Sequence, residues 1–338
     1  LNNIYGVEYN NMIEITENVS AQFIPSGHIH GACQIILYVK KPSGNIVKIA
    51  YSGDLGNIIF EQPFVRDFEK VVKANMYIGE CTYNDKTRSV KKEQRAKDIE
   101  MIKNVVEQTC IDKKGILLIP AFAMQRIETI LYTLWSIYKD DEKFDIPIIV
   151  DSPLAVKLLD CFVNGLEGDD KRILEEVLAW KNIKVIRTIE DSQACVLDTK
   201  PKIVCSSSGM LTQGRSIMYL KKILPRRNCC ILTIGYCAEG TLAWTIKNRS
   251  DQKTITIDEK AYPNRCDIKS LRSFSSHMQY EELMNYYVNL ANNGCDVIWL
   301  VHGDKNKLNF KKELEERIRK INKSTKVMAT NFDTVTRL

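Results

Sequence analysis

The sequence predicts an α/β fold built around a mainly parallel β-sheet. Short apolar and β-branched segments alternate with longer segments of helical periodicity, the pattern of strand–helix–strand units. The chain has 338 residues, of which 44% are hydrophobic and 27% charged, enough for two domains or for one domain with a large insertion. A disordered tail and a small disulfide-rich protein are therefore excluded.

The first elements surround a β-hairpin. Two β-branched segments, 35–39 and 46–51, flank the turn residues 42–45, and the second segment ends at the turn Ser52-Gly53-Asp54. A short apolar strand is expected at 76–79. The charged segment behind it, 88–108, has the apolar spacing of an exposed amphipathic helix.

The rest of the chain repeats this alternation. Buried strands are expected at 116–119, 147–150, 185–187, 203–205, 230–234 and 297–301. Helices are expected between and after them, at 125–138, 154–164, 171–180, 216–224, 280–290 and 305–321. Helices that connect successive strands favour a parallel sheet.

Composition narrows the class of protein. The chain has 48 Lys+Arg and 42 Asp+Glu, which gives a net charge of +6. A protein with this charge can bind a polyanion, but the charge alone does not identify a nucleic-acid-coating protein. Eleven cysteines without a C-x-x-C spacing indicate free thiols in a reducing cytoplasm. The sequence shows neither a signal peptide nor an apolar run of ~18 residues, so we expect a cytoplasmic protein with no membrane partner. Because the chain begins at Leu1, we expect a fragment of a longer protein.

Polar residues beside glycine follow five of the expected strands or turns. In open α/β sheets, functional groups collect where strands end, so these five positions predict one composite site. They are Ser26-Gly27-His28, Ser52-Gly53-Asp54, Gly79-Glu80, Ser206-Ser207-Ser208-Gly209 and Val301-His302-Gly303.

All four histidines lie at strand ends or among small residues: His28, His30, His277 and His302. His28 and Asp54 bracket the hairpin, and imidazole with carboxylate is a ligand set for zinc or manganese. Each of these residues also has a structural alternative. A histidine can be hydrogen-bonded in the core, and Glu80 can stabilise a helix N-terminus. The serines before His277 can be N-caps of the helix that follows.

Two glycine-containing turns are candidates for anion binding. The turn 206–210 lies between a strand and Gly214-Arg215 ahead of a helix, so it offers hydroxyls, backbone amides and a guanidinium. The turn 235–241 follows the next strand. Neither contains the Gly-Lys-Ser/Thr element of a Walker loop, and a glycine turn without a ligand is the alternative for each.

Taken in order, these motifs resemble the β-CASP branch of the metallo-β-lactamase-fold nucleases, which includes the endonuclease of mRNA 3′-end processing and RNase J. The resemblance extends from about residue 20 to about residue 310. It rests on Gly27-His28-x-x-Gly31-Ala32, Ser52-Gly53-Asp54, Glu80-x-Thr82-Tyr83, Pro120-Ala121-Phe122-Ala123, Asp151-Ser152-Pro153, Ser207-Ser208-Gly209-Met210, Gly214-Arg215, Ala238-Glu239-Gly240-Thr241, Ser273-Phe274-Ser275-x-His277 and Val301-His302-Gly303.

The resemblance implies a metallo-β-lactamase αββα sandwich, incomplete at its N-terminus, with an inserted β-CASP α/β domain. Residues 1–84 and 276–338 would form the sandwich part, and residues 85–275 the β-CASP domain. The implied activity is that of a zinc-dependent RNA phosphodiesterase acting on single-stranded RNA, with two zinc ions in the intact family site.

The resemblance also implies residue roles. His28, Asp54 and His302 would be metal ligands, with Asp54 bridging two ions. Glu80 and His277 would be catalytic together with Asp54. The β-CASP domain would bind RNA phosphates through Asp151, Ser207, Ser208, Gly209 and Arg215.

The chain lacks several of the metal ligands that this family uses. The family takes further ligands from a His-x-His-x-Asp-His motif before His28, and no histidine precedes His28 here. We therefore expect a truncated form with little activity and at most one weakly held zinc. Glutamine replaces the usual glycine at 125 and 213, and Gln279 replaces the usual aspartate.

Two other functions remain open: a non-catalytic RNA-binding or scaffolding pseudoenzyme, and a metallohydrolase of small substrates. The sequence does not decide between endonuclease and exonuclease, and it does not identify the RNA target. It also leaves the oligomeric state undetermined, a homodimer being one state that it allows.

Overall fold

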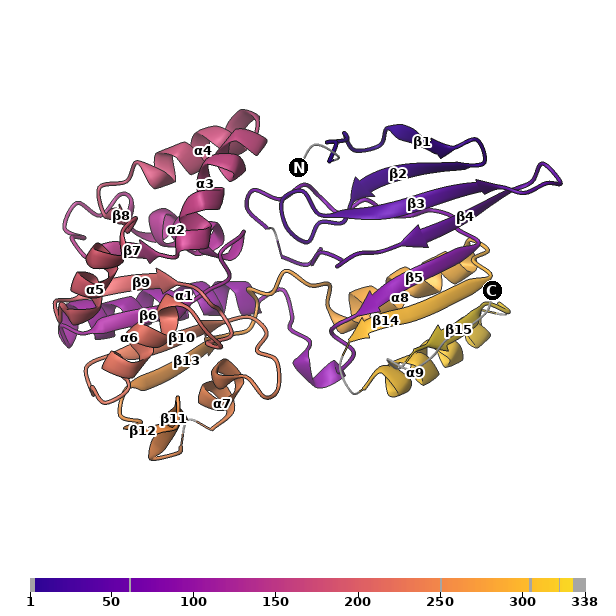
Figure 1. Cartoon of the computed structure of the whole chain (residues 1–338). Coiled ribbons are helices and arrows are strands. Elements are labelled where there is room, and N and C mark those ends of the chain that lie inside the picture. The colour runs from indigo at the N-terminus through magenta and orange to yellow at the C-terminus, as the bar shows by residue number, and fades with distance from the viewer. Residues whose placement is uncertain (1–3, 61, 250, 304–305, 322, 331–338) are drawn as a thin grey trace. The chain divides into compact units, whose positions relative to one another are not determined.

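The computed structural model describes residues 4–60, 62–249, 251–303, 306–321 and 323–330 (Figure 1). The chain divides into two compact units. The first unit comprises 1–61, 65–91 and 276–338, and the second comprises 62–64 and 92–275. In the described part of the chain, no helix is both long enough and apolar enough to cross a membrane.

The first unit contains a mixed seven-stranded sheet in the order β1-β2-β3-β4-β5-β14-β15. Neighbouring strands from β1 to β4 are antiparallel, and those from β4 to β15 are parallel. The strands are β1 (Met12–Thr16), β2 (Val19–Pro25), β3 (Cys33–Lys40), β4 (Ile46–Tyr51), β5 (Met76–Cys81), β14 (Val297–Gly303) and β15 (Lys326–Ala329). Its helices are η1 (Lys86–Arg88), α8 (Tyr280–Asn292) and α9 (Lys307–Lys320).

One face of this sheet packs against α8 and α9. Ala50 pairs with Ile36 on one side and with Tyr77 on the other, so the three side chains share a face. All three are buried in one cluster with Leu283 of α8 and Phe310 of α9. The hydrophobic core of the first unit therefore lies between this sheet face and the two helices.

The second unit contains a parallel six-stranded sheet in the order β13-β10-β6-β9-β7-β8. Its strands are β6 (Ile116–Pro120), β7 (Ile148–Asp151), β8 (Ile183–Val185), β9 (Lys202–Ser206), β10 (Cys230–Ile234) and β13 (Asp267–Leu271), with a separate hairpin of β11 (Thr254–Ile257) and β12 (Lys260–Pro263). The helices are α1 (Gln94–Val106), continued by the π-helical η2 (Glu107–Asp112), α2 (Arg126–Tyr138), α3 (Pro153–Gly165), α4 (Gly168–Leu178), α5 (Ile189–Leu197), α6 (Arg215–Ile223) and α7 (Leu242–Asn248).

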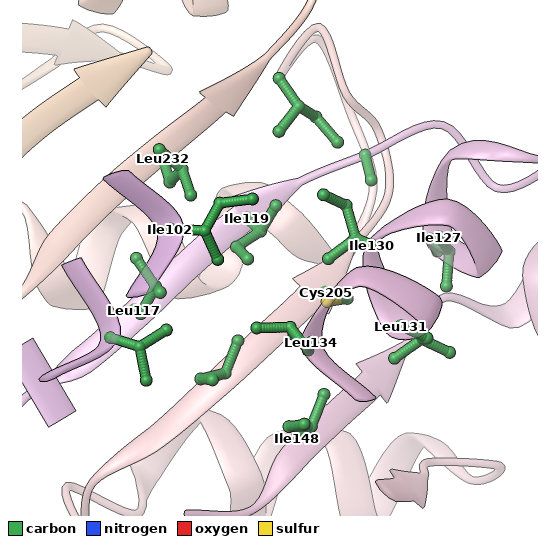
Figure 2. Close-up of a cluster of buried hydrophobic side chains, with 14 of the residues drawn as sticks. Ile102, Leu117, Ile119, Ile127, Ile130, Leu131, Leu134, Ile148, Cys205 and Leu232 are labelled. Carbon is green, nitrogen blue, oxygen red and sulfur yellow. The ribbon is translucent and has the colours of Figure 1, made fainter. Parts of the chain in front are cut away.

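Helices cover both faces of this second sheet. Leu117 and Ile119 of β6 lie in one buried cluster with Ile102 of α1 and Leu134 of α2, as Figure 2 shows. Leu118, which points to the opposite face, lies in another cluster with side chains of α6 and α7. The second unit is thus a three-layer α/β/α structure, the arrangement that the alternating sequence pattern predicts.

Most expected elements are confirmed, and the differences are local. The strand expected at 185–187 is β8 at 183–185, and the helix expected from residue 88 begins at Gln94. Residue 305, where another helix was expected to begin, lies outside the described residues, and α9 begins at Lys307. The sequence interpretation did not include several mostly short elements: β1, β2, β11, β12, β13, β15, α5, α7 and η1.

Candidate functional site

The candidate site of the first unit lies at one edge of its sheet. The strand directions place the C-terminal ends of β2, β4, β5 and β14 at the same edge. His28 and Asp54 follow β2 and β4, while Glu80 and His302 lie at the ends of β5 and β14. The fifth residue, His277, joins this edge through an isolated bridge to Gly56. The composite site expected from strand ends is therefore formed in part within this unit.

Close contact between two turns brings His28 and Asp54 together. A Cβ atom on Gly56 would lie 1.9 Å from the carbonyl oxygen of Gly27, so no side chain fits there. Gly27 has a φ of +71°, which favours glycine. Sequence reasoning did not identify Gly56, because its requirement arises from a contact between turns that are distant in sequence.

The imidazoles of His28 and His302 lie near opposite oxygens of Asp54. His28 Nε2 is 3.8 Å from Asp54 Oδ2, and His302 Nε2 is 3.9 Å from Asp54 Oδ1. His28 and His277 have ring centroids 4.4 Å apart. One ligand atom from each of His28, Asp54 and His277 lies within 4.8 Å of the other two.

This donor set fits a zinc ion. Imidazole nitrogen and carboxylate oxygen are common zinc ligands. His302 Nε2 lies near the other carboxylate oxygen of Asp54, so it would add a further imidazole ligand at this edge. His30 is half-buried and is not one of the grouped ligands.

Glu80 is held as a buried carboxylate next to His277. Its Oε1 lies 3.2 Å from His277 Nδ1 and accepts a hydrogen bond from the Leu55 amide at 2.9 Å, while its Oε2 accepts one from the Thr82 amide at 2.7 Å. Burial would raise the pKa of Glu80, but the hydrogen bond and charge of His277 and the bonds from Thr82 outweigh it and lower the pKa to about 2. Glu80 is therefore ionised at neutral pH.

The geometry supports two chemical roles for His277. With Nδ1 directed at Glu80, its ring is oriented to carry a proton, as a general acid does. Its place beside His28 and Asp54 would also allow it to bind a metal. Tyr287 further fixes this edge, because its hydroxyl donates a hydrogen bond to the Glu80 carbonyl.

The remaining candidate residues lie in the second unit, at the C-terminal ends of β7 and β9. Asp151 is fully buried, and its carboxylate accepts hydrogen bonds from Arg215, Ser192 (2.6 Å) and Tyr219 (2.7 Å). The Arg215 guanidinium that bonds it is itself largely buried, with a side chain that is 12% exposed. This pair therefore supports the turn after β9 from within, and contacts of Asp151 and Arg215 with RNA stay a prediction.

The turn after β9 carries two half-buried serines, Ser207 and Ser208. Ser207 shares a hydrogen bond with Ser152 at 2.8 Å. Ser208 Oγ accepts a bond from the Thr212 amide at 3.2 Å and lies 3.3 Å from the Thr212 hydroxyl. Gly209 packs closely against the backbone of Ala121 and Phe122. These groups retain the chemistry expected for phosphate binding.

Two known protein families match parts of this chain. The family described as "Beta-Casp domain" matches residues 125–246, and the family described as "Zn-dependent metallo-hydrolase RNA specificity domain" matches residues 261–325.

Curated relatives match most of the chain. Ribonuclease TTHA0252 of Thermus thermophilus is 28% identical over 297 residues, which cover 86% of this chain and 64% of the relative. An RNase J-like protein of Methanocaldococcus jannaschii is 28% identical, with 85% of this chain and 64% of the relative covered. Endoribonuclease ysh1 of Schizosaccharomyces pombe is 27% identical, with 89% and 38% covered. The chain thus spans less than two thirds of the length of these relatives.

Proposed function

The chain belongs to the β-CASP metallo-β-lactamase family, and we propose that it carries the machinery of a zinc-dependent phosphodiesterase acting on single-stranded RNA. One observation carries this proposal: a buried carboxylate–histidine pair, Glu80–His277, lies directly beside the ligand-type residues His28 and Asp54. A structural ion pair alone would not require metal-ligand chemistry next to it.

In this proposal, His28, Asp54 and His302 hold zinc, with Asp54 shared between two positions. Bound zinc polarises a phosphoryl group and makes water a stronger nucleophile. The two Asp54 oxygens each lie near a different imidazole, which supports the shared role. The three residues come from three separate segments at one edge of the sheet, so the fold of the first unit sets their spacing.

His277 acts as the general acid. The ionised Glu80 accepts a hydrogen bond at Nδ1 and favours the protonated ring, so Nε2 would give its proton to the leaving oxygen. A general acid and a metal ligand at this position predict different effects of replacing His277. Replacing His277 with alanine would lower the rate by roughly 10²- to 10⁴-fold, while the zinc content stays unchanged.

The second unit binds the RNA backbone through the hydroxyls of Ser207 and Ser208 and the backbone at Gly209. Asp151 and Arg215 hold this turn in place as positioning residues. Hydroxyl and amide contacts to phosphate carry no base information, so they would bind RNA with little sequence preference. Residues 85–275 form the β-CASP domain in this proposal, and residues 1–84 and 276–338 form the metallo-β-lactamase part.

The chain as given would bind at most one zinc, weakly, and would cleave slowly. It has four histidines in all, and three ligand residues divided between two positions leave each ion with too few protein ligands. The same shortage of ligands favours a second candidate, a non-catalytic RNA-binding protein that retains the fold.

Cleavage of a 5′-labelled single-stranded RNA, with and without added zinc, tests these alternatives. We expect slow hydrolysis that requires zinc and is lost in Asp54→Asn. RNA binding with no zinc-dependent hydrolysis would favour the non-catalytic candidate. If the chain neither binds nor cleaves single-stranded RNA, the proposed function is wrong.

A further inference from the structure

The loop between β6 and α2 directs two large apolar side chains into solvent. Phe122 is 49% exposed and Met124 is 36% exposed, whereas Ala121, Ala123 and Gln125 are all buried. Single exposed apolar side chains are common on protein surfaces, so the exposure of Phe122 points to a ligand only together with the polar groups beside it.

The backbone of this loop is fixed at both ends. The Ala121 amide donates a hydrogen bond to the Ser206 carbonyl at 2.9 Å, which continues the pairing of β6 with β9. At the other end, the Gln125 side chain donates a hydrogen bond to the Pro63 carbonyl at 2.7 Å, and α2 begins at Arg126. The exposure of Phe122 is therefore set by the fold.

Phe122 lies beside the serine turn that follows β9. A Cβ atom on Gly209 would be 3.0 Å from the Phe122 amide nitrogen and 3.3 Å from ring atom Cδ2, so the glycine permits the turn to approach the ring closely. Ser208 precedes Gly209 and presents its hydroxyl next to that of Thr212. An apolar ring and a pair of hydroxyls thus occur together at the C-terminal edge of one parallel sheet.

This combination matches the chemistry of a nucleotide. A nucleobase offers a flat face that stacks on an aromatic ring, and the attached phosphate accepts hydrogen bonds from hydroxyls and amides. A docked protein would require a much larger apolar area than two side chains supply. The pairing of a ring with phosphate-binding groups therefore favours a nucleic-acid strand.

We propose that Phe122, flanked by Met124, is a stacking platform for one base of a single-stranded nucleic acid whose phosphate contacts the Ser208 turn. This inference rests on the proposed function. It adds a contact with a base, whereas the hydroxyls and amides of the Ser208 turn contact only phosphate. Since every base has a flat face, the platform tolerates all sequences but requires that a base be present.

Fluorescence anisotropy of the full chain with labelled oligoribonucleotides tests the platform. Phe122→Ala should weaken binding by about 5- to 100-fold, Phe122→Leu should weaken it similarly, and Phe122→Tyr should retain the affinity because it keeps the ring. The control is Leu197→Ala: Leu197 is also an exposed apolar residue, at the end of α5 just before β9 begins, and its removal should leave binding unchanged. Thermal unfolding of each variant verifies that it is folded.

An abasic oligonucleotide of the same length provides a second comparison. The wild type should bind it more weakly than the base-containing strand, and Phe122→Ala should bind the two strands equally. Full affinity in Phe122→Ala or in Phe122→Leu would overturn the platform while leaving the proposed function intact. Absence of any binding by the wild type would overturn the proposed function itself.

Discussion

The two sheets of this molecule differ in how their faces are covered. In the second unit, β6, β7, β9 and β10 are buried along their whole length, and alternate side chains enter two different clusters. In the first unit, one row of paired residues is buried, and the neighbouring row is only partly buried. The buried row is Ile36, Ala50, Tyr77 and Ile298, and the partly buried row is Leu37, Ile49, Met76 and Val297.

The fully covered sheet and the candidate metal-binding residues therefore lie in different units of the chain. The second unit is a three-layer structure, which supports the turn after β9 that carries the proposed phosphate-binding groups. The candidate metal-binding residues lie on the first unit, in whose sheet only one of these two rows is fully buried. We therefore expect the second unit to be the more stable part of this chain and the metal site to be the weaker part.

The largest expected effect concerns the buried ion pair of the second unit. Arg215→Ala leaves the Asp151 carboxylate buried without its cation, which should lower the free energy of unfolding by about 3 to 5 kcal/mol. Lys113→Ala breaks the exposed pair with Asp267 and should cost about 1 kcal/mol or less. Urea unfolding followed by tryptophan fluorescence measures both, and equal losses would contradict the supporting role of Arg215.

A matched pair of leucine substitutions tests the difference between the sheets. Leu117→Ala removes a fully buried side chain from the second sheet and should cost about 3 to 5 kcal/mol. Leu37→Ala removes a partly buried one from the first sheet and should cost about half of that or less. Hydrogen exchange on peptides from each unit reports the two losses separately. An equal or larger loss for Leu37 would show that its sheet face is packed as tightly as the second sheet.

A smaller effect concerns Glu128 on α2, whose Oε2 has no hydrogen-bond partner among the described residues. Burial raises the pKa of Glu128 from 4.5 to about 7. The folded state therefore binds this proton more tightly than the unfolded state, so stability should fall as pH rises from 4.5 towards 7.

Glu128→Gln should remove that dependence and stabilise the protein at neutral pH by on the order of 2 kcal/mol. Glu175→Gln, on the exposed side of α4, is the control and should change little. Urea unfolding at pH 5 and at pH 7.5 measures the effect. A variant with the same pH dependence as the wild type would show that Glu128 is not its source.

The sequence predicts strands that are covered on both faces better than exposed strands, for a physical reason. Strands covered on both faces, such as 116–119 and 203–205, are continuous apolar runs, and these give a strong signal. β1 is mostly exposed, and β13 alternates between exposed and half-buried residues, so their sequences resemble loops.

Contacts between residues distant in sequence limit how much of the candidate site could be predicted. The closeness of His28 and Asp54 follows from the hairpin between them, and it could be predicted. The buried state of Asp151 and Arg215 could not be predicted, because it depends on tertiary contacts of Asp151 with Ser192 of α5 and Tyr219 of α6. The contact between Gly27 and Gly56 is likewise tertiary.

The zinc content of the chain tests the central claim most directly. After dialysis with zinc and then against zinc-free buffer, elemental analysis should find at most one zinc per chain. His28→Ala should lose it, while His30→Ala, outside the ligand group, should retain it. Two tightly held zinc ions per chain, or one zinc ion that both the wild type and His28→Ala retain, would contradict the account of the first unit as an incomplete metal site.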